Sequence, residues 1–288
     1  MANLEQIVSQ KTQSDTQWKL ERQVERETAS SMQDAGITEI TSSPEAYARY
    51  LDMQGNNPTY SAGNIALVMV QDPEATRFGT RDRWGTLGRS IVDTEANKGV
   101  KIFARTAFSK ATVLTDAYDI RQTQGRSVKE TQLQNGTKEM EEALTTLLNY
   151  SAVPVTIDKE LDAPALYDEA QMELVINPGY EDTVSFSAIA AEVAQSRFHA
   201  KGANRNYDRE ECELDAQSVS YILCRRFGID RELPDVSGVA ALYEGWESQE
   251  RRQALDCVQD MSKQIGGSIE RDITPQQRSR TPIHRTTR

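Results

Sequence analysis

The sequence predicts an α+β protein, with a small mixed α/β domain followed by a mostly helical domain that contains a short sheet. The length of 288 residues is typical of about two domains. Two β-branched runs, at 99–105 and 111–120, predict strands in the first domain, whereas helical patterns dominate the second. A polar stretch at 121–137 predicts a linker between these patterns and places the domain boundary near residue 130.

The first domain is predicted to span residues 39–128 and to follow a polar helical arm at 1–38. Ser43 as an N-cap with Pro44 directly after it predicts the start of a helix, since this pair satisfies and pre-forms the first helical turn. The apolar run YSAGNIALVMVQ, at 60–71, predicts a buried helix.

The second domain is predicted to span residues 129–270. An amphipathic pattern predicts a helix at 138–150, and the short runs VPVTID and MELVINPG predict strands. Three further helices are predicted at 183–200, 211–229 and 248–265. The basic, proline-containing tail at 271–288 is expected to be disordered.

Composition excludes several classes of protein. No apolar run approaches the roughly 20 residues of a membrane span, and the N-terminus has no signal-peptide core, so we expect a cytoplasmic protein without a membrane partner. Three cysteines without CxxC spacing indicate plain thiols in a reducing compartment. The net charge of −11 excludes wholesale coating of nucleic acid but leaves room for a local basic groove.

Cations and aromatic rings alternate in the first domain, as single-stranded nucleic acid requires. Cations neutralise phosphates, and each stacked base contributes about 1–3 kcal/mol. Residues 40–123 hold ten Lys and Arg against nine Asp and Glu, so an aromatic core with ordinary surface charge is an open alternative. The candidate contacts are Tyr60 and Trp84 for stacking, and Arg81, Arg83, Arg89, Lys98 and Lys101 for phosphates.

The segment from 60 to 105, followed by YDIRQT, resembles the N-terminal domain of ArdC-type antirestriction proteins. The matching residues are Tyr60, Asn64, Trp84, Gly88, Arg89, Lys98, Gly99, Tyr118, Asp119, Gln122 and Thr123. The resemblance implies a domain that binds single-stranded DNA, encoded on plasmids and conjugative elements, and it adds Asn64 to the candidate contacts. Asp93 and Glu95 depart from the family pattern, because they stand where the family usually has a basic turn.

In the second domain, AIAAEVAQSRFHA resembles the HExxH helix of zinc peptidases, where two histidines hold the ion beside a general base. Glu192 stands in the general-base position, but Ala191 and Gln195 stand in the histidine positions. The chain has two histidines, His199 and His284, so a two-histidine site on this helix is impossible. Without a metal to lower the pKa of water to about 7, Glu192 alone cannot activate it.

The ArdC-type family usually continues with a zincin-like metallopeptidase domain, which the resemblance implies here in a form without catalytic residues, metal or cofactor. In this likeness Glu213, Asp215 or Gln217 takes the place of the third metal ligand, and His199 is not a ligand. Two alternatives stay open. Glu192 with Glu213 or Asp215 could form a carboxylate site for magnesium or calcium, or the whole segment could be a plain helix-packing surface.

Three functions follow from these patterns. The first is a single-stranded-DNA-binding protein of a mobile element, resembling antirestriction proteins, with a dead metallopeptidase-like domain and a restriction, defence or conjugation protein as a second partner. The second is a metal-dependent hydrolase with a non-standard site around Glu192. The third is a protein-interaction or regulatory module that does not bind DNA.

Overall fold

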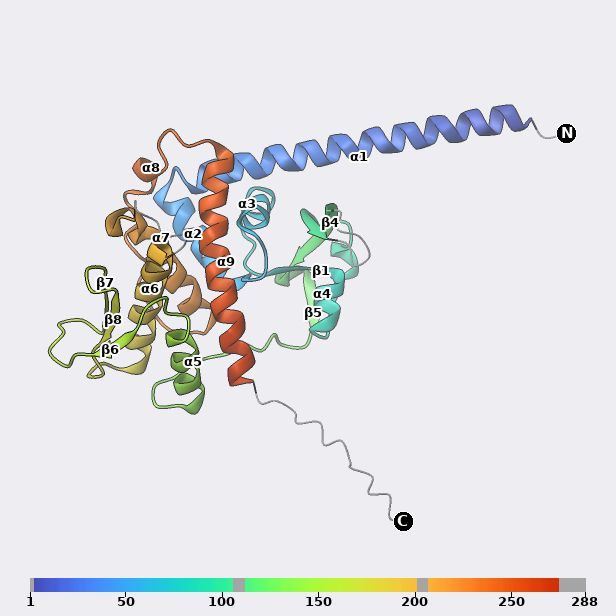
Figure 1. Cartoon of the computed structure of the whole chain (residues 1–288). Coiled ribbons are helices and arrows are strands. Elements are labelled where there is room, and N and C mark those ends of the chain that lie inside the picture. The colour runs from blue at the N-terminus through green and yellow to red at the C-terminus, as the bar shows by residue number, and fades with distance from the viewer. Residues whose placement is uncertain (1–2, 106–111, 201–206, 275–288) are drawn as a thin grey trace, which may run out of the picture.

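The computed structural model describes residues 3–105, 112–200 and 207–274. Helices form most of this part of the chain, together with small antiparallel and mixed sheets, which confirms the predicted α+β class (Figure 1). The tail predicted to be disordered lies outside the described residues from 275 onward. None of the described helices is both long enough and apolar enough to cross a membrane.

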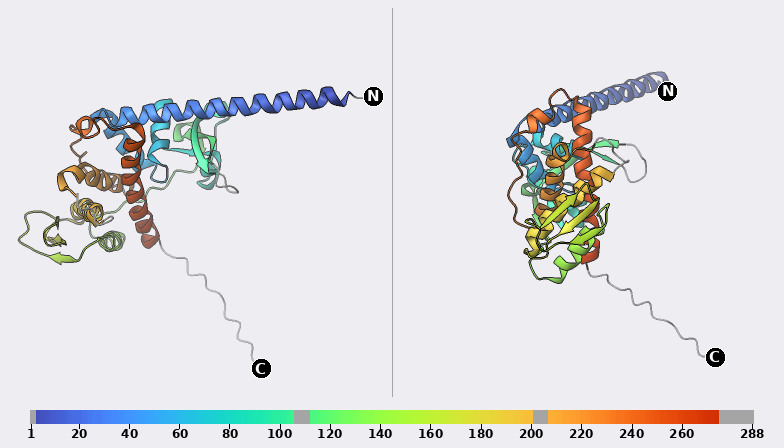
Figure 2. Two further views of the ribbon diagram at one scale, coloured as in Figure 1. Left: turned by 45° about the horizontal axis from the view of Figure 1, so that its top comes forward. Right: turned by 60° about the vertical axis from the view of Figure 1, so that its left-hand side comes forward.

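The N-terminal arm is one long helix, α1 (Leu4–Ile40), which extends well beyond the rest of the described chain (Figure 1, Figure 2). Its buried residues begin only at Ala29 and end at Ile40. Gly36 permits this close packing, because a Cβ there would lie 2.9 Å from the carbonyl oxygen of Ala66. The helix predicted in this arm is therefore confirmed, and its C-terminal third is anchored in the core.

Two short helices follow as predicted, α2 (Pro44–Asn56) and α3 (Ala62–Gln71). The Ser43 hydroxyl caps α2 by accepting a hydrogen bond from the backbone amide of Ala46. Helix α3 is buried along most of its length, as its continuous apolar sequence indicates.

The N-terminal part contains two small antiparallel sheets. The predicted strands β3 (Val100–Arg105) and β4 (Thr112–Asp119) are confirmed and pair with each other, and β4 also pairs with β1 (Phe78–Thr80). A second pair joins β2 (Arg89–Ile91) to β5 (Thr123–Gly125). The predicted linker at 121–137 is wrong for its first residues, because they complete this sheet and the preceding 3₁₀ turn η2 (Ile120–Gln122). Along the chain, helix α4 (Arg81–Thr86) connects β1 to β2, and the 3₁₀ turn η1 (Asp93–Glu95) connects β2 to β3.

The C-terminal part packs a mixed sheet of order β6-β8-β7 against helix α6, at the outer side of the helices (Figure 1). Its strands are β6 (Val155–Ile157), β7 (Ala165–Asp168) and β8 (Glu173–Ile176). Its helices are α5 (Lys138–Leu148), α6 (Asp182–Ala200), α7 (Arg209–Arg226), α8 (Val239–Leu242) and α9 (Ser248–Ile273). Each predicted helix and strand is confirmed, and β7 and α8 are additions.

Helix α9 runs between the N-terminal and C-terminal parts and contacts both (Figure 1, Figure 2). One continuous apolar core joins Ile37 and Tyr47 to Val219 and Ile265 across this helix. A smaller separate core lies under α4 and consists of Trp84, Ile91 and Tyr118. The proposed domain boundary at residue 128 stays a prediction, and the main core passes across it.

Candidate functional site

Helix α6 carries the three residues that occupy the HExxH pattern, and all three are buried. Ala191 is 3%, Glu192 7% and Gln195 0% exposed. Residues at positions i and i+4 share one helical face, so Ala191 and Gln195 point to the same side as two metal-binding histidines would. The two positions are thus arranged on α6 as the histidines of an HExxH motif are, but neither carries a histidine.

Both carboxylate oxygens of Glu192 are engaged by the protein. Oε1 accepts a hydrogen bond from Nη2 of Arg209 at 2.7 Å, and Oε2 accepts one from the backbone amide of Tyr167 at 2.8 Å. The side chains of Glu192 and Arg209 are 10% and 31% exposed. The general-base position therefore holds half of a shielded ion pair, whose cation is a guanidinium group.

Gln195 is fixed from both ends of its amide. Nε2 donates to Oε2 of Glu213 at 2.8 Å, and Oε1 accepts from the hydroxyl of Tyr207 at 2.9 Å. The other carboxylate oxygen of Glu213 accepts from Nε2 of Gln217 at 2.6 Å, and Gln217 in turn accepts from Arg231. We call the set Glu192, Gln195, Tyr207, Arg209 and Glu213 the replacement network.

The replacement network does not fit a zinc ion. Ala191 offers no donor atom, and the amide of Gln195 and the carboxylate of Glu213 are already bonded to each other. Within the part of the chain that the structure describes, no three His, Cys, Asp or Glu residues gather closely enough to hold a metal. The carboxylate site for magnesium or calcium considered from the sequence is therefore not formed there.

Of the three candidates for the third ligand, Glu213 is the residue that faces position 195. Sequence patterns missed Arg209 and Tyr207, which follow the undescribed segment 201–206. The sequence did contain one indication that Arg209 has a charged partner. Arg209 is the first residue of α7, where a positive charge interacts unfavourably with the helix dipole. Such a residue needs a carboxylate partner, which Glu192 supplies.

His199 lies in the last turn of α6 and is not placed as a ligand. Its ring stacks on Tyr207, with centroids 4.3 Å apart and an interplanar angle of 9°. Its Nδ1 lies 2.6 Å from the hydroxyl oxygen of Tyr167. The residue therefore fixes the two tyrosines beside the replacement network.

A cavity of about 560 Å³ remains beside Ala191 and Glu192. Its other walls include Ser187, Gln217 and Arg231. The face of α6 that carries Ala191 and Glu192 therefore borders open space.

Asp215, the second candidate ligand, faces a different part of the molecule. Burial raises the pKa values of the tyrosines Tyr47, Tyr50 and Tyr243, and the nearby carboxylate of Asp215 raises them further. Its Oδ1 is sealed from solvent and has no hydrogen-bond partner among the described residues. Burial raises the pKa of Asp215 from 3.8 to about 7.

The substitution Asp215→Asn is expected to stabilise the protein at alkaline pH. A carboxyl group whose pKa is raised on folding favours the folded state at low pH, and this contribution is lost as the pH rises from about 4 to about 7. Above pH 7 the variant should gain roughly 1–3 kcal/mol in free energy of unfolding. Urea titrations at pH 4, 6 and 8 measure this, with the exposed Asp260→Asn as control; an equal gain at all three pH values would contradict it.

The predicted stacking residues differ in their exposure. Trp84 is 1% exposed, and its indole nitrogen donates to the carbonyl of Tyr118 at 2.8 Å, so the ring packs the small core and offers no face to a base in this structure. Tyr60 is half-buried and lies against Phe78, with ring centroids 4.4 Å apart. Of the two predicted rings, Tyr60 alone keeps access to solvent.

Asn64 and Arg89 have structural contacts. The amide of Asn64 donates to the carbonyl of Phe103 and accepts from its backbone amide, at 2.8 and 2.9 Å, which joins α3 to β3. Arg89 donates to the hydroxyl and carbonyl oxygens of Thr123 and to the carbonyl of Arg126, which joins β2 to β5. Every nitrogen of the Arg89 guanidinium is thereby occupied.

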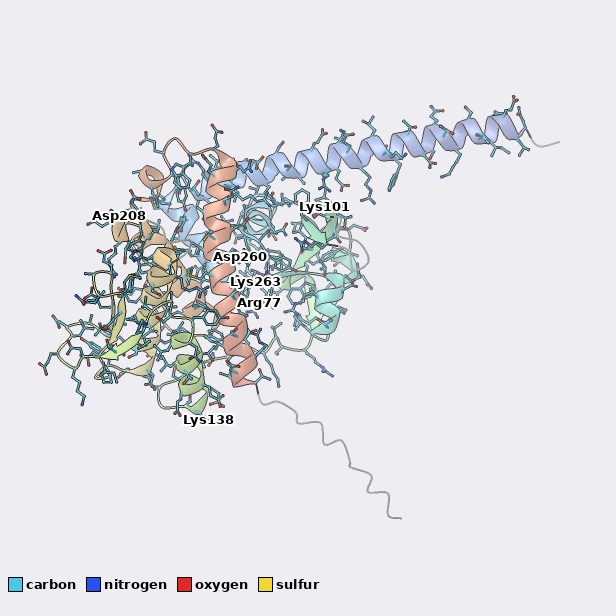
Figure 3. All side chains as sticks on the ribbon, in the orientation of Figure 1. Arg77, Lys101, Lys138, Asp208, Asp260 and Lys263 are labelled. Atoms are coloured by element: carbon cyan, nitrogen blue, oxygen red, sulfur yellow. The ribbon has the colours of Figure 1, made fainter. Side chains whose placement is uncertain are left out.

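The remaining predicted cations fall into two groups. Lys98 pairs with Glu95 at 2.8 Å, and Lys101 pairs with Glu25 and Asp116 at 3.0 Å, so these charges are neutralised. Figure 3 shows Lys101 at the sheet below α1. The second group is Arg81 and Arg83, which have no carboxylate within 4 Å among residues 3–105, 112–200 and 207–274. The same holds for two cations that were not predicted, Arg126 and Lys129. Arg126 and Lys129 were missed because they lie in the predicted linker.

Two solved structures share the architecture of this chain, both of the antirestriction protein ArdC from plasmid R388. The metal-free structure is 12% identical over 84% of this chain and 97% of its own, with a TM-score of 0.50. The Mn(II)-bound structure is 14% identical over 86% and 99%, also with a TM-score of 0.50. No family model and no curated protein matches the sequence. The chain therefore has the fold of the ArdC antirestriction protein.

Proposed function

We propose that this protein binds single-stranded DNA and acts in the manner of an antirestriction protein of a mobile element, without hydrolytic activity. The observation that carries the non-enzymatic part is the Glu192–Arg209 ion pair at 2.7 Å. In a zinc peptidase the glutamate at this position accepts a proton from the metal-held water, whereas here both oxygens of Glu192 are bonded to a guanidinium and a backbone amide.

The DNA-binding part of the proposal rests on four cations without a carboxylate partner among the described residues, which lie on α4 and in the predicted linker. Arg81, Arg83, Arg126 and Lys129 are exposed, and we call them the free-cation set. In a chain of net charge −11, such a local excess can still attract phosphates at short range because solvent screens the distant acidic groups. The protein is proposed to act in the cytoplasm, where entering single strands would meet it.

The double variant Arg81→Ala/Arg126→Ala is expected to weaken binding of a labelled single-stranded 20-mer by about tenfold. It should also reduce the salt dependence, since each lost phosphate contact lowers the slope of log K against log salt by about 0.7. Fluorescence anisotropy at several salt concentrations measures both quantities. The control is Lys159→Ala, which changes an exposed lysine elsewhere. If the double variant binds the 20-mer as tightly as wild type does, the proposed DNA-binding surface is wrong.

A protein partner is a second candidate function, and α1 favours it. The outer part of this helix exposes Leu4, Ile7, Val8 and Trp18, with Trp18 58% exposed. Exposed apolar residues on a projecting helix are typical of contact surfaces. If wild-type protein fails to bind any oligonucleotide at low salt, a restriction, defence or conjugation protein becomes the favoured partner.

A further inference from the structure

A cavity of about 200 Å³ lies where the N-terminal part, the linker and the C-terminal helices meet. The loop after α2, the strand β1 and the helix α4 form one side, residues 128–131 form another, and Arg226 of α7 with Glu270 of α9 close it. Arg77, one of its lining residues, lies between α9 and the N-terminal sheet in the view of Figure 3. We call it the junction cavity.

The junction cavity is positively charged. Four cations line it, Arg77, Arg83, Lys129 and Arg226, against the two carboxylates Glu130 and Glu270. Glu130 pairs with Arg77 at 3.2 Å and Glu270 with Arg226 at 2.9 Å. Arg83 and Lys129 belong to the free-cation set, so the cavity holds two positive charges without a counter-charge from the described residues. An anionic ligand is favoured.

An aromatic ring forms one wall. Tyr60 lines the cavity and packs against Phe78, which also lines it; the two ring centroids are 4.4 Å apart and the rings are tilted by 34°. A tyrosine is neutral at physiological pH, and burial raises the pKa of the Tyr60 hydroxyl further. A neutral aromatic face beside unpaired cations matches the two chemical parts of a nucleotide, its base and its phosphate.

The loop that carries Tyr60 is held in place before any ligand arrives. Asn57 donates to the carbonyl oxygens of Met53 and Thr76, each at 2.9 Å, and accepts from the backbone amide of Phe78 at 2.9 Å. Gln259 of α9 donates to the carbonyl of Pro58 at 3.1 Å. Such a wall loses little conformational entropy when a ligand binds.

We propose that the junction cavity holds one nucleotide of single-stranded DNA, with its base against Tyr60 and its phosphate at Arg83 and Lys129. The inference rests on the proposed function and deepens it, because it places one base at a fixed point on the bound strand. The volume admits a single ring system and excludes a duplex, whose bases are paired and stacked. Arg226 and Glu270 make the C-terminal part a structural wall of the DNA site.

The test uses the full chain and a single-stranded oligothymidylate 20-mer with one internal 2-aminopurine, read by anisotropy and by fluorescence quenching. Tyr60→Ala is expected to weaken binding tenfold or more and to relieve the quenching, whereas Tyr60→Phe keeps the ring and should stay within about threefold of wild type. Lys129→Ala, an exposed change that spares the core, should weaken binding about threefold and lower the salt slope. The matched control Lys138→Ala lies on α5, away from the cavity, and should match wild type (Figure 3).

The outcomes separate the two proposals. If wild type binds the 20-mer but Tyr60→Ala and Lys129→Ala bind it equally well, the junction cavity is not the nucleotide site, and the proposed function stands. If wild type shows no salt-dependent binding, the proposed function fails and this inference fails with it. Thermal unfolding of Tyr60→Ala shows whether the variant is folded, and Lys129→Ala decides the matter if it is not.

Discussion

The triple variant Ala191→His/Gln195→His/Arg209→Ala is expected to bind about one zinc ion per chain, where the wild type should bind less than about a tenth. Two histidines at positions i and i+4 of α6 face the same side, and Glu213 already lies 2.8 Å from the side chain at position 195. Ala191 borders the 560 Å³ cavity, which gives the first new imidazole room. Removing Arg209 frees Glu192 and removes a positive charge that would repel the ion.

The metal content of purified, dialysed protein measures this by mass spectrometry. The single variant Ala191→His is the control, since one histidine with Glu213 gives too few ligands for tight binding. A triple variant that is folded but carries no zinc would mean that the helices are displaced from metal-binding geometry, and that more than the side chains separates this chain from a metalloprotein.

The second large effect is expected for Arg209→Ala, which should lower the free energy of unfolding by about 2–3 kcal/mol. It leaves the carboxylate of Glu192, 10% exposed, without its cation. The full cost of an unpaired buried charge is about 3–5 kcal/mol, and the 31% exposure of Arg209 reduces it because water can enter the space that the side chain leaves.

Urea unfolding of Arg209→Ala, Glu192→Ala and the double variant gives the coupling energy of the pair. Arg225→Ala is the matched control, because the Arg225–Asp52 pair is 50% and 44% exposed and its loss should cost less than about 1 kcal/mol. A loss no larger for Arg209→Ala than for Arg225→Ala would show that Glu192 does not depend on the guanidinium.

The persistence of a glutamate at position 192 has a structural reason in this ion pair. A carboxylate at the general-base position suggests surviving catalysis when only the sequence is seen. In the fold, the same carboxylate holds the start of α7 and the strand β7 against α6, through Arg209 and the backbone amide of Tyr167. Stability gives a sufficient reason for the residue, without any reaction.

Sequence patterns predicted the long elements correctly, because α3 and α6 bury many of their residues and β3 is a β-branched run that pairs along its whole length with β4. The three-residue strands β2 and β5 were not predictable, since they depend on Arg89 bonding to Thr123 across 34 residues. The exposure of Trp84 and Tyr60 was equally hidden in the sequence. Both are aromatic residues that border the junction cavity, and only the tertiary packing buries Trp84 while it leaves Tyr60 half-exposed.

The two ends of helix α1 are stabilised in different ways. From Ala29 to Ile40 the helix carries its buried residues, so we expect its amides to exchange mainly through unfolding of the whole body. Toward Leu4 its turns are held by local contacts such as the Lys11–Asp15 pair at 2.6 Å, and a solvated helix of this length is marginal in water. The part of the chain that unfolds cooperatively therefore ends within α1, although the helix itself is continuous. We expect the protection of its backbone amides from hydrogen exchange to decline gradually from Ile40 toward Leu4.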